Sequence, residues 1–147
     1  MYAAMPLPAP PPLPRPWAAF RPSSPTVRRG RGLRAHATGL SAEDAACAAL
    51  ERDGWRILAR RLRTSAGEID IAAERDGLLA LVEVKARPTL ADAACCVLPR
   101  QRNRLLAAAE AALAMHPHWG ATGVRLDLIV VDARGAVRRI ADAFRQE

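Results

Sequence analysis

Residues 67–85 read GEIDIAAERDGLLALVEVK, which contains two apolar segments separated by a short polar one. The two segments at 68–73 and 78–86 are rich in apolar residues and predict two strands. Between them the chain reads ERDG, in which Asp76-Gly77 is the dipeptide typical of a tight hairpin turn. The stretch therefore predicts an antiparallel β-hairpin.

Four charged side chains lie at alternating positions of this hairpin. If Asp76-Gly77 forms a two-residue turn, Asp70 stands opposite Glu83, and Glu68 stands opposite Lys85. Side chains alternate along a strand, so every loop of even length leaves all four on one face. Only an odd loop or a β-bulge separates them.

The repulsion between the carboxylates of Asp70 and Glu83 on one face of the hairpin has to be offset. Two ionised carboxylates about 5 Å apart repel by roughly 3 kcal/mol at an effective dielectric near 20, a large part of a domain's net stability. Either Asp70 or Glu83 is protonated, or Lys85 neutralises them, or a divalent cation such as Mg²⁺ binds their oxygens. The face continues into apolar residues at 79–81, where burial begins, which favours the cation. The alternative is a salt bridge between Glu68 and Lys85 on a solvated face.

The rest of the chain predicts two helices and further strands. Ser41 is a suitable N-cap and Gly54 a suitable C-terminal residue for a first helix. A strand, helix, strand connection favours parallel pairing, so the predicted fold class is α/β, a sandwich with a central mixed sheet flanked by helices. In chain order, the predicted elements are a helix at 42–53, an exposed or edge strand at 55–63, the hairpin strands, a helix at 99–115, and strands at 124–131 and 137–140.

Charge and proline divide the chain into two parts. Residues 1–36 hold six arginines and no acid, and nine of the 12 prolines precede Thr26, which predicts a disordered Pro/Arg-rich extension. The remaining segment, 37–147, carries 16 basic and 15 acidic side chains and is the predicted folded domain. The net charge of +7 therefore says little about the domain, and a nucleic-acid partner must be argued from the site.

Other sequence features bear on location. No stretch approaches the roughly 20 apolar residues that span a bilayer, so we expect no membrane association. Three cysteines, Cys47, Cys95 and Cys96, match neither a disulfide framework nor a zinc-ligand spacing. A cytoplasmic protein in a reducing compartment fits best.

Glu43 is a further candidate for the site. It lies at helical spacing with Ala46, Cys47 and Leu50, the apolar stripe of the first predicted helix. An acid on a buried stripe points to a ligand for a cation. A first-turn carboxylate that complements the helix dipole is the alternative, and the sequence leaves both open.

These residues resemble a known family. The GEID block at 67–70, the VEVKAR block at 82–87, Glu43 upstream and the segments at 99–105 and 125–127 resemble the bacterial YraN family, a group with the restriction-endonuclease-like fold. More distantly, the chain resembles archaeal Holliday-junction resolvases and other PD-(D/E)-x-K nucleases. The proline of that label is replaced here by Ile69.

The resemblance implies roles for the candidate residues. Glu43, Asp70 and Glu83 would be ligands of Mg²⁺ or Mn²⁺, and Lys85 would be the catalytic lysine. Four more residues would lie outside the metal ligands or contact phosphate: Glu68, Gln101, Arg100 and Arg104.

The leading functional hypothesis is a divalent-metal-dependent DNA endonuclease acting on branched or otherwise irregular DNA, with residues 37–147 as its PD-(D/E)-x-K nuclease-like domain. The alternative is a module on the same fold that binds nucleic acid or protein without turnover. A third reading is a structural domain whose charged hairpin face is a salt-bridge network. A homodimer is compatible with each hypothesis.

Overall fold

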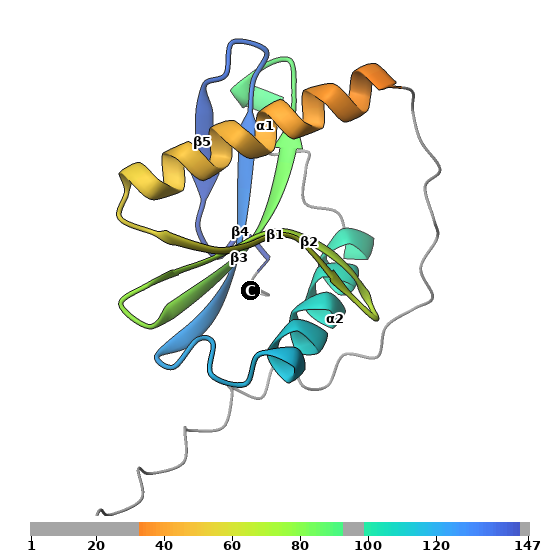
Figure 1. Cartoon of the computed structure of the whole chain (residues 1–147). Coiled ribbons are helices and arrows are strands. Elements are labelled where there is room, and N and C mark those ends of the chain that lie inside the picture. Colours follow the sequence, from red (N-terminus) through yellow and green to blue (C-terminus); the bar gives the residue numbers. More distant parts are fainter. Residues whose placement is uncertain (1–32, 93–98, 145–147) are drawn as a thin grey trace, which may run out of the picture.

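The computed structural model describes residues 33–92 and 99–144. Figure 1 shows a sheet with one long helix on either side of it. The elements, in chain order, are α1 (Leu33–Arg52), β1 (Arg56–Thr64), β2 (Gly67–Arg75), β3 (Leu78–Ala86), α2 (Pro99–Met115), β4 (Gly123–Val131) and β5 (Val137–Ile140).

The five strands form one mixed sheet in the order β1-β2-β3-β4-β5. Neighbouring strands are antiparallel except for β3 and β4, which run parallel and are joined through α2. The predicted α/β sandwich with a central mixed sheet flanked by helices is therefore confirmed, and β1 is an edge strand as expected. No helix among the described residues is long and apolar enough to cross a membrane.

The hairpin between β2 and β3 has the predicted two-residue turn. Arg75 pairs with Leu78, and the two residues between them have positive φ angles of 52° at Asp76 and 77° at Gly77. Two successive positive φ angles match the right-handed twist of the flanking strands, and Asp-Gly tolerates them. A Cβ on Gly77 would also lie 2.9 Å from the side chain of Thr122, so glycine is required there twice over.

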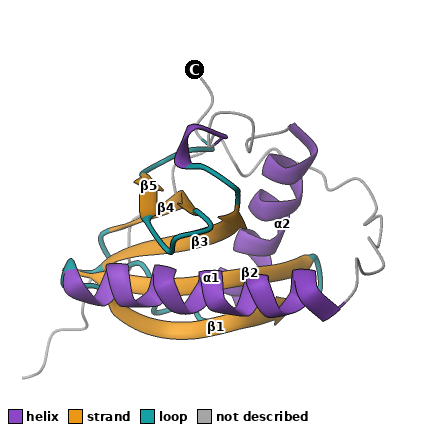
Figure 2. Ribbon diagram, turned by 90° about the horizontal axis from the view of Figure 1, so that it is seen from above, coloured by secondary structure: helices purple, strands orange, loops and turns teal. Residues whose placement is uncertain are grey.

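Figures 1 and 2 show that α1 and α2 lie on opposite sides of the sheet. Alternate residues of the strands pack against these two helices. The α2 side buries Leu79, Leu81, Leu105, Leu126 and Leu128, together with smaller residues of α2. The α1 side buries Leu50, Trp55, Ile71, Val82 and Ile129. Because β3 and β4 are covered on both faces, any charged side chain on them needs a partner.

The alternation is interrupted at two places in β1 and β2: a register shift between Ile57 and Ala59, and a break at Arg61. The register of this pair skips Arg61 and Asp70, and Arg61 has a φ of 49°. Beyond this break Leu62 and Ile69 pack on the α2 side, whereas Ile71 packs on the α1 side. At Asp70, therefore, the side chains of each strand that would face one helix turn to face the other.

The first helix differs from its prediction at the N-terminus. α1 begins at Leu33 rather than at residue 42, so the predicted cap at Ser41 is wrong, because the helix continues through it. Its end is as predicted: Gly54 has a φ of 83°, and the Trp55 N–H donates to the carbonyl of Leu50 at 3.0 Å. Residues 1–32 lie outside the described part, so the predicted disorder of the extension and its boundary stay predictions.

Candidate metal and catalytic site

The candidate site lies where strands β2 and β3 part. Their ladder ends at the pair Ile71–Val82, one position before the expected pair of Asp70 with Glu83. In place of main-chain pairing, the Val84 N–H donates to Oδ2 of Asp70 at 2.7 Å. The Asp70 side chain thus takes over a hydrogen bond of the sheet, which fixes its carboxylate beside β3.

Glu83 is a buried carboxylate with an asymmetric set of partners. Its side chain is 6% exposed, and Oε1 accepts from Lys85 Nζ at 2.7 Å and from Arg104 Nη2 at 3.0 Å. The other oxygen, Oε2, is buried and has no hydrogen-bond partner among the described residues. An unpartnered buried carboxylate oxygen is costly, so Oε2 is available to a ligand that can neutralise it.

Asp70 is electrostatically strained. Burial raises its pKa from 3.8 to about 7, and the nearby charges of Glu83 and then Glu43 act in the same direction. The hydrogen bond from Val84 and the charge of Lys85 lower the pKa without offsetting that rise. Asp70 is therefore close enough to both glutamates to feel their charge, and a cation at this position would relieve the repulsion.

Glu43 approaches the site from α1, which covers the face of the sheet opposite to α2. It is 6% exposed, and its Oε2 accepts from Arg61 Nε at 3.0 Å, with Arg60 Nη2 at 3.9 Å. Because α1 begins at Leu33, Glu43 stands well past the first turn. The alternative role as a carboxylate that complements the helix N-terminus is therefore wrong.

The predicted outer residues divide into two groups. Arg104 reaches the site through Glu83, as described above. Glu68 does not pair with Lys85, since β2 and β3 have parted there, and its Oε2 instead lies 3.7 Å from Arg63 Nε on β1. Among the described residues, Arg100 is exposed near the start of α2, and Gln101 is half-buried with an unpartnered Oε1.

Sequence reasoning missed Arg61 and Arg60 as partners of the site. The sequence showed only an arginine-rich edge strand, and no pattern of apolar and polar residues marks a left-handed residue inside a strand. The one available signal was the count of acids on α1, because Glu43 and Asp44 need basic partners and β1 is rich in them. Arg60 Nη2 in fact donates to Asp44 Oδ1 at 2.6 Å.

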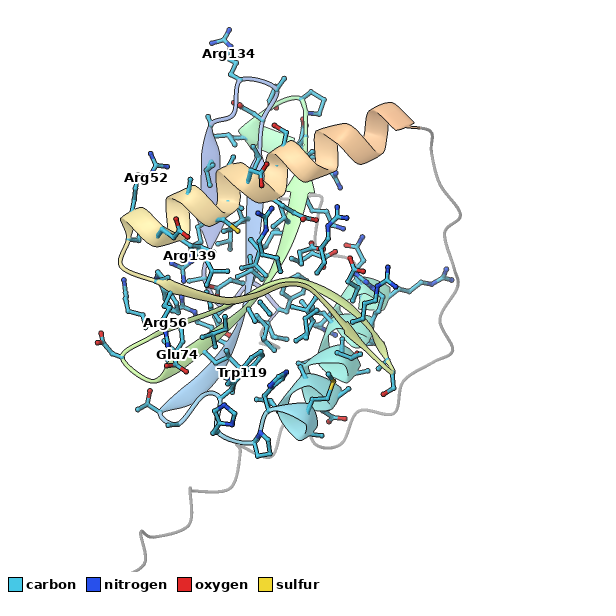
Figure 3. The ribbon with its side chains drawn as sticks, viewed as in Figure 1. Arg52, Arg56, Glu74, Trp119, Arg134 and Arg139 are labelled. Carbon is cyan, nitrogen blue, oxygen red and sulfur yellow. The ribbon has the colours of Figure 1, made fainter. Side chains whose placement is uncertain are left out.

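The segment at 125–127 belongs to a second charged cluster away from this site. Asp127 is fully buried and accepts from Arg125 Nε and Arg139 Nη2, each at 2.7 Å. The guanidinium carbon of Arg139 also lies 4.5 Å from the ring centroid of Trp55. Figure 3 shows Arg139 below the C-terminal end of α1. This cluster ties β4 to β5 and explains the motif structurally.

The donor set offers two carboxylates to a small hard cation. Asp70 and Glu83 supply carboxylate oxygens, and one of these oxygens has no other partner. Within residues 33–92 and 99–144, however, no group of three His, Cys, Asp or Glu side chains is gathered closely enough to hold an ion. Mg²⁺ commonly binds through one or two carboxylates plus water and substrate phosphate, so two carboxylates are sufficient for a fit.

Two solved structures are similar to the chain at a low level. An XisH family protein from Nostoc punctiforme gives a TM-score of 0.40 at 19% identity, over 68% of this chain and 98% of that one. An fdxN element excision controlling factor protein from Anabaena variabilis gives 0.40 at 19%, over 67% and 95%. A TM-score of 0.40 is too low to indicate a shared function.

Sequence relatives are much closer. A UPF0102 protein of Granulibacter bethesdensis is 66% identical over 115 residues, which cover 78% of this chain and 73% of the relative. One of Azorhizobium caulinodans is 50% identical over 128 residues, which cover 86% and 98%. The model of the uncharacterised protein family UPF0102 matches residues 42–131. The family that the GEID and VEVKAR blocks resemble is thereby confirmed, and the chain belongs to UPF0102, the YraN family.

Proposed function

We propose that this chain is a divalent-metal-dependent DNA endonuclease that hydrolyses phosphodiester bonds. One observation carries the proposal: Glu83 keeps a buried, unpartnered oxygen beside Asp70, whose pKa is raised by burial and by the neighbouring carboxylates. A purely structural ion-pair network would pair its buried oxygens. A carboxylate with a raised pKa beside a lysine, as at Asp70, is instead typical of catalytic sites.

Each residue has a definable role in the proposed reaction. Asp70 and Glu83 would hold Mg²⁺ or Mn²⁺, with Glu43 as a further ligand from α1. The bound ion supplies Lewis-acid polarisation of the scissile phosphate and a lowered pKa of coordinated water. Lys85, whose Nζ lies 2.7 Å from Glu83 Oε1, positions the attacking water and offsets charge on the phosphate.

Arg104 acts through Glu83 in this scheme. It shares Oε1 with Lys85, so it holds the carboxylate in one rotamer and leaves the second oxygen free. Arg100, exposed near the start of the same helix, would contact a phosphate of the DNA backbone. A preference for branched or irregular DNA belongs to the same proposal.

A cleavage assay tests the proposal. Labelled four-way junction, flap and duplex DNA are incubated with the purified chain in Mg²⁺ or Mn²⁺ and separated on a denaturing gel. Products are expected with the wild type and not with the Glu83→Ala/Lys85→Ala double variant. Arg56→Ala, which removes an exposed arginine of β1 that is paired with Glu74, serves as the matched control. Equal products from the wild type and the double variant would refute the proposal.

A non-catalytic module that binds nucleic acid or protein is the second candidate. It is favoured by the absence of a group of three metal-ligand side chains among the described residues. It is also favoured by the pairing of Glu83 with the side chains of Lys85 and Arg104. This function predicts binding of junction DNA that a chelator leaves unchanged. The proposed nuclease predicts that productive binding depends on the divalent ion.

A further inference from the structure

Arg61 combines an unusual backbone with a central position. Its φ of 49° lies in the left-handed region, which a residue with a long side chain rarely adopts inside a strand. It stands across from Asp70 at the one place where the pairing of β1 with β2 skips a residue pair. Such backbone outliers cluster at functional sites, where the surrounding structure holds them in place.

The left-handed turn of the chain changes where successive side chains point. In a regular strand Arg60 and Arg61 would project to opposite faces. Here both reach acids of α1: Arg60 pairs with Asp44 at 2.6 Å, and Arg61 pairs with Glu43 at 3.0 Å. The conformation of Arg61 therefore directs its guanidinium toward a carboxylate of the candidate site.

The two partners of this ion pair are unequal in exposure. The Glu43 side chain is 8% exposed, whereas the Arg61 side chain is 36% exposed. Glu43 thus needs a positive partner at all times, because a buried and unpaired carboxylate is costly. Arg61 does not need Glu43 in the same way, since water or a phosphate oxygen can satisfy its exposed donors.

We propose that Arg61 exchanges partners when the site is loaded. Without a cation, Arg61 neutralises Glu43 beside Asp70. Once a divalent cation takes over the Glu43 carboxylate, the guanidinium turns to a phosphate oxygen of the nucleic-acid backbone. The inference rests on the proposed function, since it assumes that a cation and a nucleic acid meet at this site.

The exchange predicts opposite effects on two ligands, measured without turnover. In Arg61→Ala, loss of a nearby positive charge tightens Mn²⁺ binding in calorimetry by roughly three- to tenfold. The same variant weakens binding of a labelled four-way junction at saturating Ca²⁺ by roughly three- to tenfold, because one phosphate contact is lost. The slope of log affinity against log salt also falls by about one.

Two further variants make the test decisive. Arg61→Gly removes the same guanidinium but suits the positive φ, so it must show both effects even if Arg61→Ala does not fold. Arg56→Ala removes another exposed arginine of β1, paired with Glu74 at 3.2 Å, and should show neither.

Both changes are required: tighter binding of Mn²⁺ and weaker binding of the junction. A residue that merely holds the fold would weaken both ligands, and that result, or a junction affinity equal to wild type, overturns the exchange. A wild type that binds neither Mn²⁺ nor the junction overturns it as well. Opposite shifts in a chain that cleaves no DNA would support the exchange and reject the nuclease, so the two proposals fail separately.

Discussion

Replacing Asp70 with asparagine should make the protein more stable at pH 8 while removing a cation ligand. The folded-state pKa of Asp70, about 7, lies above its ordinary value of 3.8 because of burial and the charges of Glu83 and Glu43. Well below pH 3.8 Asp70 is protonated in both the folded and the unfolded chain. As the pH rises from 4 to 7, the unfolded chain loses this proton first, so ionisation of Asp70 progressively destabilises the fold.

The size of the effect follows from the shift. At about 1.4 kcal/mol per pKa unit, a rise from 3.8 to about 7 corresponds to at most about 4 kcal/mol. Asp70 is partly exposed and its surroundings can relax, so we expect a gain of about 2 kcal/mol in Asp70→Asn above pH 7. The asparagine carbonyl oxygen can keep the hydrogen bond from the Val84 N–H.

Urea unfolding of the wild type and Asp70→Asn between pH 4.5 and 8 measures this difference. The free energy of unfolding of the variant, minus that of the wild type, should rise with pH and level off above about pH 7. Asp53→Asn, which removes an exposed carboxylate that follows α1, controls for general charge effects. A difference that is flat with pH, or a variant less stable than wild type at pH 8, would refute the account of Asp70.

Three other substitutions, with Arg100→Ala as a control, test the surroundings. Arg104→Ala removes one of the two positively charged side chains that pair with Glu83 Oε1, and it should lower the free energy of unfolding by about 1 kcal/mol. Arg100→Ala, at an exposed position of the same helix, should change the free energy of unfolding by less than about 0.5 kcal/mol. Asp127→Ala leaves two arginines without their shared carboxylate and should cost about 3 kcal/mol. Gly77→Ala combines a φ of 77° with a 2.9 Å approach to a threonine methyl and should cost about 1–2 kcal/mol. Chemical denaturation measures all four, and values near zero for Arg104→Ala, Asp127→Ala or Gly77→Ala would contradict the corresponding contact.

The hairpin shows how far the sequence alone can predict this structure. Asp76-Gly77 fixes the turn and the register at Arg75–Leu78, because few other dipeptides accept two positive φ angles. From that register, counting predicts the neighbourhood of Asp70, Glu83 and Lys85, although the ladder itself ends at Ile71–Val82. Local turn chemistry and the period of two carry this part of the prediction.

What the sequence could not supply are features that only tertiary packing decides. The left-handed Arg61 breaks the alternation in β1, and nothing in an arginine-rich strand marks it. The parting of β2 and β3 sends Glu68 to Arg63 instead of Lys85. The start of α1 at Leu33 also overrides a favourable cap at Ser41, since a cap signal is weak against continued helix.

A calorimetric titration of Mn²⁺ into the wild type, Asp70→Asn and Glu83→Gln at pH 8 tests whether Asp70 and Glu83 form a metal site. We expect one binding event in the wild type that is weakened at least about tenfold in each variant, because each loses one carboxylate ligand. Asp53→Asn should bind Mn²⁺ as the wild type does. An absence of binding in the wild type, or equal affinity in all four proteins, would contradict a metal site at Asp70 and Glu83.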